Sequence, residues 1–128
     1  MKQEKPYLAV YIDDDSDMID LVTLILNRQG FQVKGVQDGS LGVKTVQDEQ
    51  PDIILLDLMM PESDGWDIFQ KLKVNEFTRN IPVIILTAKA QPIDRVLGLA
   101  IAKVDGYISK PFHPQELIDC VKKVLNIV

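Results

Sequence analysis

The sequence predicts an α/β fold in which helices cover both faces of a five-stranded parallel sheet. Apolar runs typical of strands alternate along the chain with segments of helical period, five of each, joined by short connections. The strongest run, Ile53 to Leu56, is continuously apolar, as expected of a strand buried on both faces of a parallel sheet. Right-handed crossovers would place helices on both faces, whereas the strand order does not follow from the pattern.

The first three elements are predicted from their apolar patterns and end residues. Residues 7–12 form an apolar, partly β-branched and aromatic run, which predicts the first strand. Ser16 is expected to cap a helix that has apolar residues at near-helical spacing and stops at Gly30. Residues 31–36 alternate between apolar and polar, which indicates a less covered strand such as an edge strand.

The segments on either side of the Asp57 strand are less regular. A weaker helix follows the turn at residues 38–40, and Gly42 should cost it about 1 kcal/mol relative to alanine. Residues 60–65 contain proline and glycine and are predicted to form a loop. A third helix should follow, with the apolar residues of the segment 68–72 facing the core.

The last third of the chain completes the alternation. The apolar run 81–86 predicts a fourth strand, with a proline tolerated at its start. A fourth helix is expected from Gln91, and a short strand at residues 105–109. The last helix should begin at Pro114, which suits a first helical position, with His113 as part of its cap.

Composition restricts the class of protein. The chain has 128 residues, of which 46% are hydrophobic and 26% charged, as in one soluble globular domain. A net charge of −5 without a Lys/Arg run argues against nucleic acid or an anionic membrane as the main partner. The N-terminus lacks the apolar core of a signal peptide, and the single cysteine, Cys120, cannot form an internal disulfide. We therefore expect a cytoplasmic domain.

Polar residues follow the predicted strands at their carboxyl ends. Asp13 and Asp14 follow the first strand, Asp57 the third, Thr87 the fourth and Lys110 the fifth. These positions converge on one edge of a parallel sheet. Clustered carboxylates raise one another's pKa unless a cation intervenes, and carboxylate oxygens suit Mg²⁺. With a lysine and a hydroxyl, such a site is complementary to a phosphoryl group transferred onto a carboxylate.

In order and spacing, these residues resemble the motif set of response-regulator receiver domains. The motifs are Asp13-Asp14, Asp57, Met60-Pro61 followed by Asp64-Gly65, Thr87-Ala88, and Lys110-Pro111-Phe112. The resemblance extends from Tyr7 to about Leu125. It implies a flavodoxin-like (βα)5 fold, a doubly wound parallel sheet with the strand order 2-1-3-4-5. We therefore expect residues 1–128 to form a single receiver domain.

The resemblance implies how the phosphoryl group and the metal would be held. Asp57 would be the phosphoacceptor, taking a phosphoryl group from a sensor histidine kinase or a phosphotransfer protein to form an aspartyl phosphate. Mg²⁺, for which Mn²⁺ can substitute, would be bound directly by Asp14 and by Asp13 mainly through water. Asp57 and the backbone carbonyl of Met59 would complete the ligands from the protein.

A second group of residues would sense the phosphoryl group. By resemblance, Lys110 would pair with its oxygens, Thr87 would hydrogen-bond one of them and move inward, and the small Ala88 would leave room for it. Tyr107 resembles the switch aromatic of the family, whose ring turns inward as Thr87 moves. The segment 102–106 lacks the Gly-Ala-Asp-Asp that is common before this aromatic, so its turn is not predicted.

Other matching positions would support the site. Met59 and Lys89 resemble residues that tune the lifetime of the phosphoryl group. Pro61, Gly65 and Pro111 would be structural, and the peptide bond before Pro111 resembles one that is cis in this family, although cis is a minority state even before proline.

On this interpretation the protein is a switch and not an enzyme that acts on other molecules. Its own phosphorylation and dephosphorylation would be the reactions that it undergoes. The new charge would bias the surface of the fourth helix, fifth strand and fifth helix, which a downstream output domain or protein would read. A phosphorylation-dependent homodimer through this face is a further expectation, with no direct binding of nucleic acid or membrane.

Three other interpretations stay open. A Mg²⁺-dependent aspartyl-phosphate phosphohydrolase usually has a second aspartate two residues after the nucleophile, where this chain has Met59. A nucleotide- or flavin-binding protein would need a phosphate-binding loop after the first strand, where this chain has three carboxylates. The third is a protein-interaction domain that works without phosphorylation.

Overall fold

The structure, a computed structural model, describes residues 5–88 and 97–127 of the chain. Within these ranges, parallel strands form a five-stranded sheet in the order β2-β1-β3-β6-β7. The strands are β1 (Leu8–Ile12), β2 (Gln32–Val36), β3 (Ile53–Leu56), β6 (Val83–Thr87) and β7 (Gly106–Ser109). Numbered within this sheet alone, the order is 2-1-3-4-5, which confirms the predicted topology and the edge position of the second strand.

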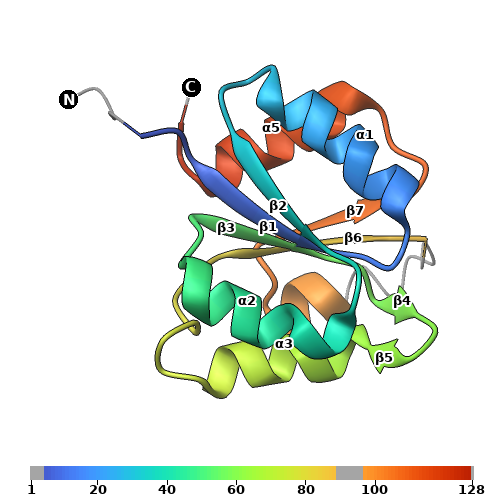
Figure 1. The fold of residues 1–128 in the computed structure, drawn as a ribbon, viewed down its shortest axis with the longest axis vertical. Coiled ribbons are helices and arrows are strands. Elements are labelled where there is room, and N and C mark those ends of the chain that lie inside the picture. Colours follow the sequence, from blue (N-terminus) through green and yellow to red (C-terminus); the bar gives the residue numbers. More distant parts are fainter. Residues whose placement is uncertain (1–4, 89–96, 128) are drawn as a thin grey trace.

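Helices cover both faces of the sheet (Figure 1). Helices α1 (Ser16–Asn27) and α5 (Pro114–Val124) lie on one face, and α2 (Gly42–Glu49) and α3 (Gly65–Val74) lie on the other. The predicted doubly wound α/β architecture is therefore confirmed.

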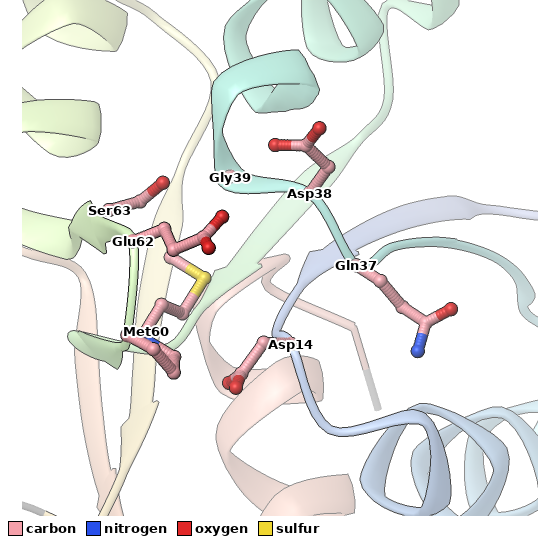
Figure 2. Close-up of a pocket in the computed structure, with 8 residues that line it drawn as sticks. Asp14, Gln37, Asp38, Gly39, Met60, Glu62 and Ser63 are labelled. Carbon is pink, nitrogen blue, oxygen red and sulfur yellow. The ribbon is translucent and has the colours of Figure 1, made fainter.

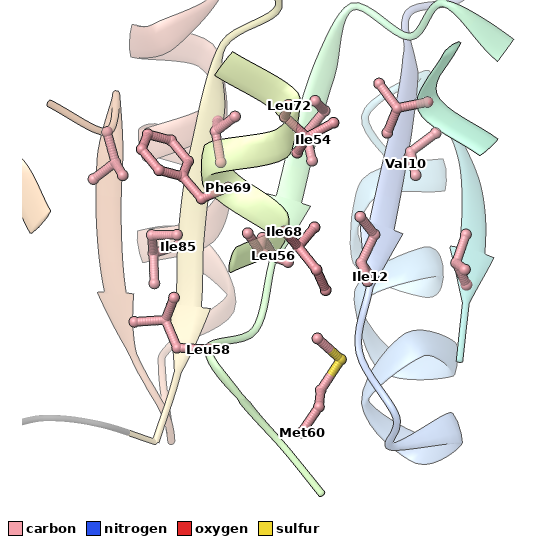
Figure 3. Packing of buried hydrophobic residues seen from close by; sticks show 14 of the residues in the cluster. Val10, Ile12, Ile54, Leu56, Leu58, Met60, Ile68, Phe69, Leu72 and Ile85 are labelled. Carbon is pink, nitrogen blue, oxygen red and sulfur yellow. The ribbon is translucent and has the colours of Figure 1, made fainter. Parts of the chain in front are cut away.

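Successive apolar residues of each strand point alternately into two hydrophobic clusters, one on each face of the sheet. Val10, Ile54 and Ile85 contribute to the cluster under α2 and α3, part of which Figure 3 shows with Ile68, Phe69 and Leu72 of α3. Tyr11 and Leu55 contribute to the cluster under α1 and α5. Strands β1, β3 and β6 are buried on both faces, which explains why their sequences are continuously apolar.

The start and the end of α1 differ from the prediction. Asp15, and not Ser16, is the N-cap residue, because its side chain accepts hydrogen bonds from the backbone N–H groups of Asp17 and Met18. The helix ends at Asn27, before Gly30, which has a left-handed backbone with φ of +86°. Both differences are short shifts at helix ends, where sequence patterns are least decisive.

Gly42 has a packing role that its low helix propensity does not predict. It begins α2, directly after the short 3₁₀ helix η1 (Gly39–Leu41). A Cβ atom at Gly42 would lie 2.8 Å from Cδ1 of Ile12, so the glycine lets α2 approach β1 closely.

The predicted loop between β3 and α3 contains two short strands. β4 (Met59–Met60) and β5 (Ser63–Asp64) pair antiparallel and lie beyond the end of β3 (Figure 1). Asp64 then caps α3, accepting a hydrogen bond from the N–H of Trp66 at 2.9 Å. Strands of two residues leave no periodic pattern in a sequence.

The last part of the chain is described from Leu97. A short π-helical segment, η2 (Leu97–Ala102), occupies the end of the predicted fourth helix, and the start of that helix lies outside the described residues. Pro114 begins α5, and Nδ1 of His113 accepts a hydrogen bond from the N–H of Gln115 at 3.2 Å, which confirms the predicted cap. Among the described helices, none is long and apolar enough to cross a membrane.

Candidate functional site

The hydrogen-bond ladder of the sheet extends past the strand ends and fixes the backbone of the candidate site residues. The N–H of Asp13 donates to the carbonyl of Val36, and the N–H of Asp57 to that of Ile12, each at 3.0 Å. The N–H of Lys110 donates to the carbonyl of Thr87 at 2.8 Å. The polar residues predicted to converge therefore come together at the carboxyl edge of the sheet.

Three carboxylates form a cluster at this edge. Asp13, Asp14 and Asp57 each offer an oxygen, and these oxygens lie within 4.8 Å of one another. Asp13 and Asp57 are buried, with exposed fractions of 0% and 4%, whereas Asp14 is exposed. Because all the donors are carboxylate oxygens and one side of the cluster faces solvent, the cluster could hold a hard, partly hydrated cation such as Mg²⁺.

Lys110 partly neutralises the buried carboxylates. Its Nζ lies 2.6 Å from Oδ2 of Asp13 and 3.4 Å from Oδ2 of Asp57. Burial alone would lower the pKa of Lys110, but the hydrogen bond to Asp13 and the charges of both aspartates outweigh burial and raise it. The lysine is therefore a fixed positive charge between two negative ones.

Asp57 is held by donors from both sides. Its Oδ1 accepts the N–H of Met59 at 3.0 Å, and its carboxylate also takes a hydrogen bond from the side chain of Thr87. Burial raises the pKa of Asp57, and these two hydrogen bonds and the charge of Lys110 only partly offset it. Asp57 thus combines a pKa above its ordinary value with a fixed orientation, which suits an oxygen nucleophile.

A cavity of about 460 Å³ opens beside the cluster on the side of Asp14. Figure 2 shows Asp14 facing Met60 and Glu62 of the β4–β5 segment across this space, with Asp38 and Gly39 above it. The cavity borders the cluster at Asp14 and gives solvent and small ions a route to that carboxylate.

Gly65 and Pro111 shape the backbone around the cluster. A Cβ atom at Gly65 would lie 2.4 Å from Cα of Leu58 and 2.6 Å from the carbonyl oxygen of Asp57, so α3 can start here only with a glycine. The peptide bond between Lys110 and Pro111 is cis, as the resemblance implied. Pro61 is exposed in the turn between β4 and β5 and lines the cavity.

The remaining predicted residues divide between the interior and the surface. Thr87 is fully buried at the end of β6, and Ala88 follows it at the exposed edge. Tyr107 is 2% exposed and belongs to the cluster under α2 and α3, so its ring points inward. The side chain of Met59 is 56% exposed. Lys89 lies outside the described residues.

The unpredicted turn before Tyr107 is closed by Asp105. Its Oδ2 accepts the N–H of Val83, and its own N–H donates to the carbonyl of Val83, both at 2.8 Å. Lys103 has a left-handed backbone with φ of +62°, a conformation that favours glycine. Asp105 therefore fastens the turn to the start of β6.

Tyr11 belongs to the candidate site, although the sequence pattern predicts only a strand residue at this position. Its hydroxyl group donates a hydrogen bond to Oδ2 of Asp13, and its side chain is fully buried. Burial, then the hydrogen bond and charge of Asp13, raise the pKa of Tyr11 far above its ordinary value, so the hydroxyl keeps its proton. One signal was available, because residues 11 and 13 of an extended strand point to the same side.

Comparisons with known proteins agree with this geometry. Residues 9–122 match the family model of the response regulator receiver domain. Regulatory protein VanRc of Enterococcus gallinarum is 36% identical over 117 residues, which cover 91% of this chain and 49% of the relative. The DNA-binding response regulator MtrA of Mycobacterium tuberculosis is 37% identical over 115 residues, which cover 90% of this chain and 49% of the relative. The chain thus spans about half the length of these curated relatives.

Solved structures share the fold. A putative response regulator from Chloroflexus aurantiacus superposes with a TM-score of 0.87 at 28% identity, covering 95% of this chain and 99% of that one. The chemotaxis response regulator CheY4 of Vibrio cholerae has a TM-score of 0.84 at 23% identity, covering 94% of this chain and 99% of that one, and supports the fold alone. The family match covers nearly the whole chain. The chain belongs to the response-regulator receiver domains, the signalling domains of two-component systems.

Proposed function

We propose that this receiver domain is switched by phosphorylation of Asp57 in a Mg²⁺-dependent reaction. The observation that carries the proposal is the convergence at the carboxyl edge of the sheet. Three carboxylates have oxygens within 4.8 Å of one another, with Lys110 paired to two of them and Thr87 hydrogen-bonded to Asp57. Residues 1–128 would act as one such domain, in the cytoplasm.

The carboxylates suit a divalent cation. Asp14 is exposed and would bind Mg²⁺, or Mn²⁺, directly, while Asp13, Asp57 and the backbone carbonyl of Met59 would supply the other contacts. Asp13 already receives three donors, so it would contribute mainly through water. A bound cation would neutralise the repulsion between the carboxylates and an incoming phosphoryl group.

Asp57 would act as the nucleophile. One of its oxygens attacks the phosphorus of a phosphohistidine on a sensor kinase or phosphotransfer protein, forming an O–P bond. The N–P bond breaks, and the imidazole nitrogen keeps the electron pair and takes a proton from solvent. Lys110 would pair with the phosphoryl oxygens, Thr87 would donate to one of them, and Ala88 would leave space. The exposed side chain of Met59, with Lys89, would influence the access of water and hence the lifetime of the product.

The change would reach other proteins through the surface formed by η2, β7 and α5. This surface has exposed apolar side chains, Leu97 and Leu99, and a cavity of about 360 Å³ that Tyr107 and Cys120 help to line. Movement of Thr87 toward the phosphoryl group would alter the packing of Tyr107 and so this surface. An output domain or protein would read it, and two phosphorylated copies would dimerise there. An unchanged sedimentation coefficient on activation, across micromolar concentrations, would count against the dimer.

Intact-mass spectrometry after incubation with acetyl phosphate tests the proposal. We expect an adduct with the mass of one phosphoryl group in the presence of Mg²⁺, and no adduct with EDTA or in Asp57→Asn. Asp64→Asn is the matched control, because it removes a carboxylate from the same segment while asparagine still caps α3.

A rapidly hydrolysed adduct is distinguished from a missing one with beryllofluoride, a stable phosphoryl analogue. Binding of the analogue to the wild type with Mg²⁺, but not to Asp57→Asn, supports the proposal. If neither acetyl phosphate nor beryllofluoride modifies the wild type, the chain is an interaction domain that works without phosphorylation.

A further inference from the structure

Tyr11 supplies a hydrogen bond to the site that the proposed function does not use. Its hydroxyl donates to Oδ2 of Asp13, the same oxygen that lies 2.6 Å from Nζ of Lys110. The other oxygen of Asp13, Oδ1, accepts the backbone N–H of Asp15 at 2.9 Å. Of these three donors, Lys110 is the one that also contacts Asp57.

Asp13 and a phosphoryl group on Asp57 would compete for the ammonium group of Lys110. In this structure its ammonium group is 0.8 Å closer to Asp13 than to Asp57, the difference between 3.4 and 2.6 Å. Pairing with a phosphoryl group on Asp57 weakens its contact with Asp13. Asp13 is fully buried, and a buried carboxylate that loses a donor is strongly destabilised. A second donor on the same oxygen reduces this cost.

Tyr11 is placed to be that donor. Its ring is fully buried in the cluster under α1 and α5, and its backbone lies inside β1, paired with both β2 and β3. The hydroxyl therefore cannot follow Lys110 and stays on Asp13 when the lysine moves.

We propose that Tyr11 is a positioning residue that keeps Asp13 hydrogen-bonded and thereby releases Lys110 to a phosphoryl group on Asp57. The inference rests on the proposed function. Without the hydroxyl, Oδ2 of Asp13 keeps only Lys110 among the donors in the described part of the chain. The lysine is then held more tightly at Asp13, and a phosphoryl group on Asp57 loses part of its partner.

The test compares Tyr11→Phe with Tyr7→Phe. Both variants keep the aromatic ring. The Tyr7 ring stacks on Phe31 with centroids 5.4 Å apart, just before β1, so Tyr7→Phe removes a hydroxyl away from the carboxylate cluster and is a matched control. Beryllofluoride affinity is measured by ¹⁹F NMR at saturating Mg²⁺, and Mg²⁺ affinity by calorimetry. We expect Tyr11→Phe to weaken beryllofluoride binding about tenfold, with Mg²⁺ bound at least as tightly as in the wild type. Tyr7→Phe should change neither.

A second readout separates positioning from a loss of structure. In Tyr11→Phe, the ammonium protons of Lys110 should exchange with water more slowly, because the lysine is held more tightly at Asp13. A merely structural hydroxyl would instead weaken Mg²⁺ and beryllofluoride binding together, which would overturn the proposal. Equal beryllofluoride affinity in Tyr11→Phe and the wild type would overturn it as well. A wild type that binds no beryllofluoride removes the proposed function itself, an outcome distinct from these two.

Discussion

The ammonium group of Lys110 lies 2.6 Å from Oδ2 of Asp13, and this ion pair joins two strand ends that are 97 residues apart in the sequence. The side chain of Lys110 is 15% exposed and that of Asp13 is fully buried. Removing one member of such a pair leaves a buried charge without its partner, which costs far more than breaking a pair in water. The Lys44–Asp48 pair of α2, at 3.1 Å, offers the comparison, since its side chains are 75% and 58% exposed.

Lys110→Met should therefore destabilise the fold much more than Lys44→Met. We expect the free energy of unfolding without divalent cations to fall by about 3 kcal/mol for Lys110→Met. For Lys44→Met the loss should stay below about 1 kcal/mol. Urea denaturation in the presence of EDTA measures both. Equal losses would mean that the buried pair contributes no more than the exposed one.

The raised pKa of Asp57 makes metal-free stability depend on pH. Burial raises this pKa, so the folded protein binds the proton of Asp57 more tightly than the unfolded chain does. The free energy of unfolding should then decrease as pH rises from the ordinary pKa of aspartate to the raised value, and stay lowered above it. Asp57→Asn should lack this decrease and be more stable than the wild type at neutral pH. Unfolding curves at several pH values with EDTA measure this, and parallel pH profiles for the two proteins would contradict it.

Divalent cations should offset the decrease in the free energy of unfolding that the charged Asp57 causes. A ligand present at one hundred times its Kd and bound only by the folded state adds about 2.7 kcal/mol to the free energy of unfolding. Asp14→Asn should lose most of this gain while its metal-free stability changes little, because Asp14 is exposed. Asp15→Asn should keep the gain, since Asp15 lies outside the cluster and asparagine caps a helix as well as aspartate does. Thermal denaturation with Mg²⁺ and with EDTA compares the three proteins. An equal gain in Asp14→Asn would place the cation elsewhere.

The sequence predicted the sheet because its signals were long and regular. Four-residue apolar runs and helical periods specify buried strands and amphipathic helices, and the polar residues at the strand ends then converge through topology alone. The sequence did not predict the two-residue strands β4 and β5 or the cap at Asp15. Each depends on local backbone geometry, and several neighbouring polar residues are equally compatible with that geometry. Tyr11 was missed for another reason. An aromatic residue inside an apolar strand is typical of a core, and only the structure shows its hydroxyl on Asp13.

Gly65 should be intolerant of a side chain for steric reasons. Gly65→Ala would place Cβ against the backbone of Asp57 and Leu58, forcing α3 away from the segment that carries Asp57. We expect a loss of about 2 kcal/mol or more in the free energy of unfolding, and weaker beryllofluoride binding. Gly30→Ala is the control, because no atom beyond its chain neighbours lies within 4 Å of its Cβ position, so its cost comes from the left-handed backbone alone. It should destabilise by about 1 kcal/mol and leave beryllofluoride binding unchanged. Unchanged binding in Gly65→Ala would show that α3 does not position Asp57.

The turn at Lys103 should be improved by glycine. Lys103 has φ of +62° and an exposed side chain, so Lys103→Gly relieves backbone strain without removing buried contacts. The left-handed conformation costs a non-glycine residue about 1–2 kcal/mol. Glycine loses about 0.5–1 kcal/mol through its greater freedom in the unfolded chain. The net expectation is a gain of about 0.5–1 kcal/mol in the free energy of unfolding, measured by urea denaturation.

Lys71→Gly, at an exposed position inside α3, should instead lose about 1 kcal/mol, because glycine there has the entropic cost without relief of strain. A loss in Lys103→Gly would mean that Asp105, which ties this turn to Val83, already fixes the backbone without strain at Lys103.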